Sequence, residues 1–144
     1  IYTPYRFQEL FEKRAVDIVQ PDISHVGGLF FSKKIAAMTA ANYVAYAPHN
    51  PCGPISNAAA LQIAACTPEF YILETMMVDV PWRKELTDEQ IQFEDGFIII
   101  PDRPGLGIEL QEEAFSAHPY QPHTLRHYTG QLTNIRPSGS ISLF

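Results

Sequence analysis

The sequence predicts an α/β fold, because segments with helical spacing alternate with short strand-like runs along its first half. Three apolar runs, at residues 15–20, 43–47 and 70–73, have the length and the residue types of buried β-strands. One helical segment precedes the first run, and another lies between each successive pair. Since parallel strands need crossover connections, this alternation predicts a parallel sheet with helices packed outside it.

Apolar spacing and end signals define the three helices of this half. Phe7, Leu10 and Phe11 share one face of the first helix, which indicates an amphipathic segment. A Gly-Gly pair precedes the second helix, and Ser56 is a candidate N-cap for the third. We expect these helices at residues 6–14, 29–41 and 56–66.

The character of the chain changes after residue 80. Two apolar runs, at 91–93 and 97–100, flank Asp95 and Gly96, and an Asp-Gly pair is a strong hairpin signal. A Pro-Gly-Leu-Gly turn follows at 104–107, a short helix is expected at 112–117, and an extended tail is expected from Pro119 onward. We therefore expect one part at residues 1–80 and a second, less regular part at 81–144.

Polar residues follow each of the three predicted strands: Asp22, His49 and Glu74. Since the carboxyl ends of parallel strands meet at one edge of a sheet, the three side chains should lie close together, as in the active sites of (β/α) barrels. A carboxylate beside an imidazole orients a general base, and a protonated carboxyl group can donate a hydrogen bond to a developing oxyanion. Taken singly, each residue is more typical of a turn, a structural hydrogen bond or a solvated acid. Only their joint position at three successive strand ends gives the catalytic interpretation equal weight.

Composition excludes several classes of function. The net charge of −6, without a Lys/Arg cluster, argues against a nucleic-acid binder, and no apolar run is long enough for a membrane helix. Cys52 and Cys66 are not in C-x-x-C spacing, so neither a disulfide nor a zinc site is implied. The cytoplasm is the default compartment. The chain starts at Ile1 without Met, which leads us to expect a piece of a longer protein.

Several motifs together resemble the second half of an enolase-superfamily enzyme of the mandelate racemase/muconate lactonizing subgroup, and most of all its sugar-acid dehydratases of the galactonate dehydratase type. The most specific is the His-Asn-Pro-x-Gly-Pro-Ile-Ser segment at 49–56. The others are Gln-Pro-Asp at 20–22, Gly-Gly at 27–28, Ala-Pro-His-Asn-Pro at 47–51, Ile-Leu-Glu at 72–74 and Pro-Gly-Leu-Gly-Ile-Glu at 104–109.

This resemblance implies a fold and an incomplete active site. It implies the C-terminal part of a TIM-like (β/α) barrel, about three βα units, followed by a segment that returns to the capping region with a hairpin and an extended tail. A complete barrel needs about 250 residues. The three carboxylate ligands of Mg²⁺ would lie on strands that this chain lacks. Glu9, Glu12 and Asp17 do not replace them, because their positions are on a helix face or within a strand.

The resemblance also implies a reaction. Asp22 corresponds to the acid of a His–Asp dyad, His49 to its base, and Glu74 to the hydrogen-bond donor for the enolate. In such enzymes the base removes the proton next to the carboxylate of an aldonate, Mg²⁺ stabilises the enediolate, and loss of water gives a 2-keto-3-deoxy acid. His25 is a candidate substrate-binding residue, although purely local contacts are as compatible with its position. The complete enzyme is expected to be a homo-oligomer.

Three alternatives stay open. The chain could be an inactive remnant that folds only by association, because three parallel strands leave unpaired edges. It could derive from a racemase or epimerase of the same superfamily. A third hypothesis is a metal-binding module that uses Asp22, His25 and His49 as ligands.

Overall fold

The computed structural model describes residues 1–76, 80–88 and 91–122. The chain divides into two compact units, residues 1–114 and 115–144. In the first unit, helix α1 (Pro4–Glu12) begins at a proline, which suits the first helical position because its missing N–H would have no partner there. The helix buries Phe7 and Phe11, as the apolar spacing predicts, but it begins and ends two residues before the predicted bounds.

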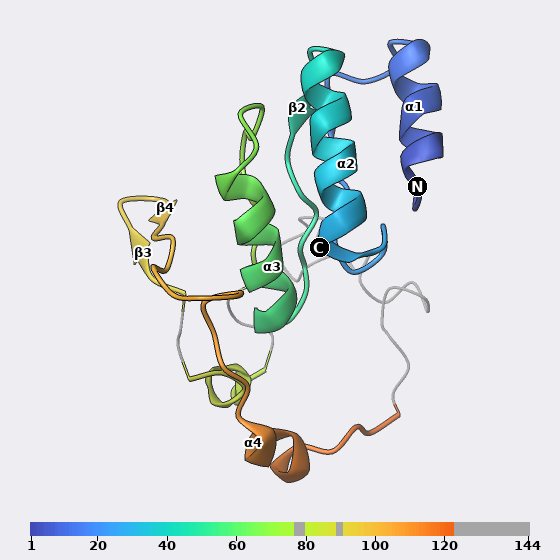
Figure 1. The fold of residues 1–144 in the computed structure, drawn as a ribbon. Helices are drawn as coiled ribbons and strands as arrows, with labels where there is room; N and C mark the ends of the chain where they lie inside the picture. Colours follow the sequence, from blue (N-terminus) through green and yellow to red (C-terminus); the bar gives the residue numbers. More distant parts are fainter. Residues whose placement is uncertain (77–79, 89–90, 123–144) are drawn as a thin grey trace, which may run out of the picture. The chain divides into compact units, whose positions relative to one another are not determined.

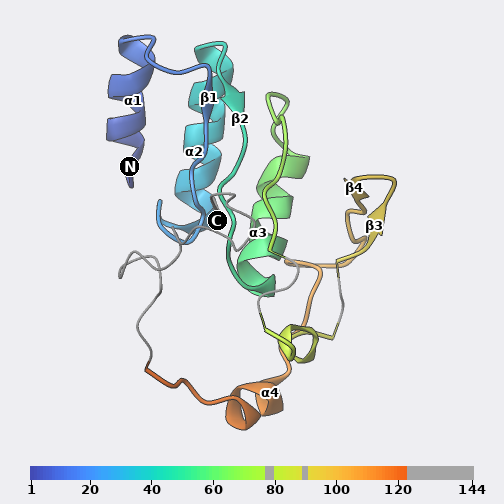
Figure 2. The ribbon, with the colours of Figure 1, turned by 180° about the vertical axis from the view of Figure 1, so that it is seen from behind.

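A minimal parallel sheet follows α1. Strand β1 (Ile18–Val19) pairs with β2 (Ala45–Tyr46), and helix α2 (Gly28–Ala41) connects them. Figures 1 and 2 show α2 and α3 on the same side of these strands. Parallel pairing with a helical crossover is therefore confirmed, although both strands are shorter than predicted.

The third predicted strand, at 70–73, is reduced to a single parallel bridge between Tyr46 and Phe70. Two backbone hydrogen bonds form it: the Tyr46 N–H donates to the Glu69 carbonyl, and the Tyr71 N–H donates to the Tyr46 carbonyl, both at 2.9 Å. The bridge lies at Tyr46, the last residue of β2. The order of the three extended segments is nevertheless the predicted one.

Helix α3 (Pro54–Ala65) begins earlier than predicted. Its N-cap is Gly53 and its first residue is Pro54, so the prediction of Ser56 as N-cap is wrong. Because proline is compatible with the first helical position, the helix starts at Pro54, two residues before the predicted start. The core of the unit forms between the helices and the strands, and its buried apolar members are Phe7, Phe11, Val19, Ile23, Val26, Ile35, Ala36, Val44, Tyr46, Ala60 and Ile63.

The later part of this unit contains the predicted hairpin. Strand β3 (Phe93–Glu94) pairs antiparallel with β4 (Phe97–Ile98), and the two turn residues have φ of +49° at Asp95 and +84° at Gly96. Positive φ at both positions is the type I′ pattern that an Asp-Gly pair favours. The hairpin prediction is therefore confirmed.

The remaining elements are short. A 3₁₀ helix, η1 (Arg83–Glu85), was not predicted, whereas the turn at 104–107 is closed by a hydrogen bond from the Gly107 N–H to the Pro104 carbonyl at 3.2 Å. Helix α4 (Glu112–Ala117) has the predicted bounds and crosses the boundary between the two units. Most of the predicted tail, residues 123–144, lies outside the described residues, and the predicted division near residue 80 stays a prediction.

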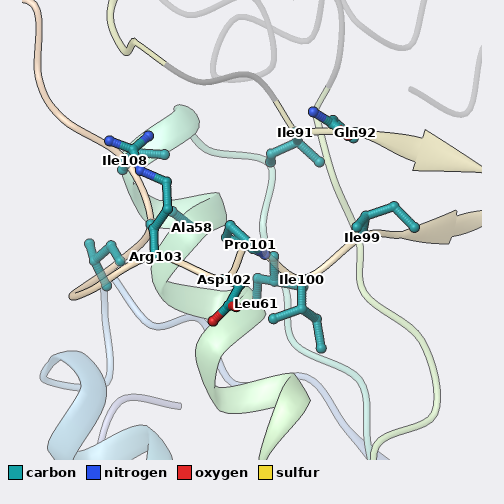
Figure 3. A pocket seen from close by; sticks show the side chains of 12 residues that line it. Ala58, Leu61, Ile91, Gln92, Ile99, Ile100, Pro101, Asp102, Arg103 and Ile108 are labelled. Atoms are coloured by element: carbon teal, nitrogen blue, oxygen red, sulfur yellow. The ribbon is translucent and has the colours of Figure 1, made fainter.

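The segment after the hairpin encloses an apolar cavity of about 390 Å³ against α3 (Figure 3). Ala58 and Leu61 of α3 face Ile100, Pro101 and Ile108 there. The predicted catalytic side chains do not line this cavity. None of the helices that the structure describes has both the length and the apolar character needed to span a bilayer.

Candidate active site

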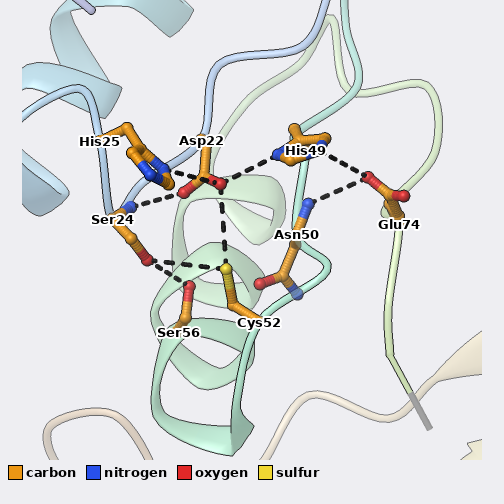
Figure 4. Close-up of polar contacts among 8 residues, drawn as sticks. All are labelled: Asp22, Ser24, His25, His49, Asn50, Cys52, Ser56 and Glu74. Carbon is orange, nitrogen blue, oxygen red and sulfur yellow. Dashed lines mark hydrogen bonds and ion pairs between the residues drawn. The ribbon is translucent and has the colours of Figure 1, made fainter. Parts of the chain in front are cut away.

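Asp22 lies in the turn directly after β1, and its side chain is buried. Its backbone carbonyl accepts hydrogen bonds from the N–H groups of His25 and Val26, which shape the turn. Its carboxylate has two polar sides (Figure 4): Oδ1 accepts the Ser24 N–H at 2.8 Å, and Oδ2 lies 2.9 Å from Nδ1 of His49 and 3.0 Å from Nδ1 of His25. The carboxylate is thus an anchor for both imidazole rings.

Opposing effects act on the pKa of Asp22. Burial is the largest of them and raises the pKa, because a desolvated carboxylate is less stable. The hydrogen bonds from His49, from the Ser24 N–H and from His25, together with the charge interaction with His25, outweigh burial. The pKa of Asp22 therefore lies below its ordinary value of 3.8. Asp22 is therefore ionised at neutral pH.

His49 lies beyond β2, in the loop that starts at Pro48. With its Nδ1 directed at an ionised Asp22, the ring carries its proton on Nδ1 and presents the lone pair of Nε2. About half of the side chain (46 %) is exposed, and Nε2 lies 3.9 Å from Oε2 of Glu74. The arrangement leaves Nε2 accessible as a proton acceptor.

Glu74 lies on the extended segment that follows the bridge at Phe70. Its Oε2 accepts a hydrogen bond from the Asn50 N–H at 3.1 Å, which fixes the carboxyl group beside the His49 ring (Figure 4). The structure therefore brings Asp22, His49 and Glu74 together at one edge of the parallel segments. Their catalytic roles stay predictions.

Of the three predicted catalytic residues, His25 contacts only Asp22. Its side chain is 57 % exposed, and its ring also packs against Tyr2, with 6.0 Å between the ring centroids. The contact with Asp22 is local, whereas the contact with Tyr2 joins residues far apart in the sequence. Substrate binding by His25 stays a prediction.

Sequence reasoning missed several polar neighbours of the cluster. The Cys52 Sγ lies 3.8 Å from Oδ2 of Asp22, and the hydroxyl groups of Ser24 and Ser56 lie 2.9 Å apart. Behind Glu74, the buried Asn50 and Asn57 form a side-chain pair. Asn50, Cys52 and Ser56 all belong to the 49–56 segment that contains His49. The contacts of Cys52 with Asp22 and of Ser56 with Ser24 nevertheless had no signal in the sequence, because they join residues 30 and 32 positions apart.

Metal ligation by these residues has no support in the geometry. The described parts of the chain contain no group of three His, Cys, Asp or Glu side chains arranged to hold a metal ion. Both histidines direct Nδ1 at the same carboxylate oxygen, which makes them hydrogen-bond partners of Asp22 rather than co-ligands with it. On α1, Glu9 pairs with Arg6 and Glu12 accepts a hydrogen bond from Gln8. The metal-binding module is therefore not supported.

Comparison with known proteins places these observations in a family. Residues 1–114 match the model of the family described as enolase C-terminal domain-like. A D-xylonate dehydratase from Haloferax volcanii is 35% identical over 125 residues, which are 87% of this chain and 30% of that protein. A D-galactonate dehydratase from Variovorax paradoxus is 39% identical over 119 residues, or 78% of this chain and 31% of that protein.

A solved structure shows the same likeness. It is a protein from Burkholderia xenovorans, provisionally assigned as an L-alanine-DL-glutamate epimerase and bound to magnesium and fumarate, with 35% sequence identity and a TM-score of 0.77. The similarity covers 83% of this chain and 29% of that one. The chain thus spans about 30% of the length of the curated relatives that it matches.

Proposed function

Because this chain belongs to the enolase C-terminal domain-like family, we propose that it forms one side of the active site of a sugar-acid dehydratase. The observation that carries the proposal is the 2.9 Å contact between Nδ1 of His49 and Oδ2 of Asp22, which leaves Nε2 accessible. The D-xylonate and D-galactonate dehydratases among its relatives support an aldonate as the substrate class. The general part of the proposal, an α/β fold of the TIM-barrel type, rests on the family match.

His49 is the base in this mechanism. Its Nε2 takes the proton from the carbon next to the substrate carboxylate, and the electron pair of that C–H bond moves into an enediolate. The ionised Asp22 stabilises the resulting imidazolium through Nδ1–H, since an opposite charge at hydrogen-bond distance favours the charged ring. The electron pair then expels the hydroxyl group of the neighbouring carbon, which takes up the proton carried by Nε2 of His49 and leaves as water. The enol product then becomes a 2-keto-3-deoxy acid.

Glu74 stabilises the charge that develops on the substrate. Its Oε2 accepts a hydrogen bond from the Asn50 N–H. In this proposal the other oxygen, Oε1, therefore donates the hydrogen bond to the enediolate from the protonated carboxyl group. The separation of 3.9 Å between Oε2 and Nε2 of His49 supports the proposal that one substrate contacts both groups.

Magnesium is not assigned to residues of this chain. The described residues do not supply the three carboxylates that such an ion requires, so no step above passes through it. In the complete enzyme we expect Mg²⁺ to bind carboxylates outside this set. It follows that the 144-residue chain alone should show no Mg²⁺-dependent dehydration of aldonates, and turnover by the chain alone would contradict this assignment.

The proposed function is tested with the full-length protein that contains this sequence. A panel of C5 and C6 aldonates, with Mg²⁺ present, is assayed for 2-keto-3-deoxy acids. We expect product from at least one member of the panel, and none after His49→Asn. Turnover of the panel by His49→Asn at the wild-type rate would show that another residue is the base.

A racemase or epimerase is the second candidate, favoured by the solved relative from Burkholderia xenovorans. The same reactions run in D₂O distinguish the two, because a racemase incorporates deuterium next to the carboxylate without loss of water. An inactive remnant would do neither. The dehydratase proposal requires loss of water.

A further inference from the structure

Two buried asparagines connect the loop that carries His49 to the segment that carries Glu74. Asn50 and Asn57 are 0 % and 1 % exposed. The Asn50 Nδ2 donates to Oδ1 of Asn57 at 2.7 Å, and the Asn57 Nδ2 donates to Oγ1 of Thr75 at 2.8 Å. Since Asn50 directly follows His49 and Thr75 directly follows Glu74, the chain of hydrogen bonds runs from one predicted catalytic residue to the other.

A backbone hydrogen bond also joins the two segments directly. The N–H of Asn50 donates to Oε2 of Glu74 at 3.1 Å (Figure 4). The side chain of Asn50 therefore contacts Asn57, while its backbone holds the carboxyl group of Glu74. Asn57 lies in the first turns of α3, which is packed into the core through Ala60 and Ile63. Through Asn57, α3 is thus connected to the segment that carries His49 and to the segment that carries Glu74.

The energetics argue against a simple packing role. A buried amide that loses its partner costs about 1–3 kcal/mol, whereas an apolar side chain at the same place would carry no such penalty. Among the described residues, Oδ1 of Asn50 has no hydrogen-bond partner, so this side chain already bears part of that cost. The contact with Asn57 is therefore the hydrogen bond that offsets the burial of this amide.

We infer that Asn50 and Asn57 are positioning residues, which set the spacing between the base and the carboxyl group that it faces. The consequence for catalysis rests on the proposed function. The structural part of the inference does not, because it concerns only the immobilisation of the 48–51 loop. Neither asparagine touches the substrate in this account: they act through His49 and Glu74.

Hydrogen exchange in the full-length protein tests the structural part. Pro48 and Pro51 have no N–H, so the segment 48–51 contains only the amides of His49 and Asn50. Asn57→Leu should speed exchange in this segment about tenfold or more, because the donor to Glu74 is no longer held. The matched control is Gln62→Leu, the same kind of substitution further along α3, which should leave exchange there unchanged.

Kinetics test the catalytic part. A displacement of about 1 Å between catalytic groups lowers kcat by about a hundredfold, so Asn57→Leu should lower kcat by between about ten- and a hundredfold, with KM within about threefold of wild type. Thr75→Val, which removes the hydroxyl acceptor but keeps the shape, should act in the same direction. Thr75→Ser keeps the hydroxyl group and should retain most of kcat.

A double-substitution experiment separates positioning from a general loss of stability. If Asn57 acts through Glu74, its substitution should have little further effect on kcat in a Glu74→Gln background. Unchanged exchange at 48–51 in both Asn57→Leu and Thr75→Val would overturn the inference, and so would fully additive losses of kcat. If the wild-type protein transforms no sugar acid, the proposed function fails, and the exchange experiment still decides whether the asparagines immobilise the loop.

Discussion

At the scale of single residues, the carboxylate of Asp22 organises the site. One oxygen, Oδ2, is shared by two imidazole rings at 2.9 Å and 3.0 Å, while Oδ1 is held by the backbone of its own turn. Because Oδ2 contacts Nδ1 of both rings, it fixes the ring orientations of His25 and His49. Any change in the charge of Asp22 should therefore affect the tautomer of His49 as well as the stability of the turn.

The depressed pKa of Asp22 predicts how stability depends on pH. Because the folded state binds the proton more weakly than the unfolded state, ionised Asp22 stabilises the fold above its ordinary pKa of 3.8, and this contribution is lost as pH falls towards the lower folded pKa. Urea unfolding of the full-length protein and of Asp22→Asn should therefore show a stability difference near pH 6 that shrinks below pH 3.8. A difference that stays constant over this range would contradict the ionised assignment.

At the scale of elements, the start of α2 is a demanding position. Gly27 is the N-cap and has φ of +103°, and a Cβ atom there would overlap the Phe31 ring. Gly53, the N-cap of α3, has ordinary extended backbone, and a Cβ atom there would meet no other atom within 4 Å. The two caps are therefore a matched pair in which only the first requires glycine.

Substitution of these caps tests the description of α2. Gly27→Ala should destabilise the protein by about 1–3 kcal/mol, since both a strained backbone and a displaced ring result. Gly53→Ala should change stability by no more than about 1 kcal/mol. Thermal unfolding of the two variants measures this contrast, and equal effects would contradict the positive φ at Gly27.

At the scale of the whole molecule, the sequence predicts those features that depend only on residues adjacent in the chain. The hairpin at Asp95 and Gly96, the end of α2 at Ala41 and the bounds of α4 follow from local turn and cap chemistry, and the structure has them. The strand at 70–73 was overestimated, because strand length depends on a partner rather than on the apolar run itself. The contacts of Asn57 with Thr75 and of Cys52 with Asp22 could not be predicted, because they join residues far apart in the sequence.

Exposed apolar residues on the outer parallel segment predict association of the isolated chain. Tyr71 and Ile72 are 69 % and 61 % exposed beside a single bridge, and an unpaired segment of this kind pairs readily with another chain. The 144-residue chain alone should elute above its monomer mass of 16.2 kDa, and Ile72→Lys should shift it towards the monomer. Tyr43→Lys is the control, because Tyr43 is also exposed but lies directly after α2. A compact monomer would count against dependence on a partner.

The family match assigns the chain to the enolase C-terminal domain-like proteins. The central claim is the proposal that His49, in contact with Asp22, is the base. The most direct test is the rate of aldonate dehydration by the full-length protein with His49→Asn, with circular dichroism to verify folding and Gln62→Leu as the control. General base catalysis contributes about 10²–10⁴-fold, so we expect a loss of that size for His49→Asn and a control within about threefold of wild type. A folded His49→Asn protein that retains the wild-type rate would contradict the central claim.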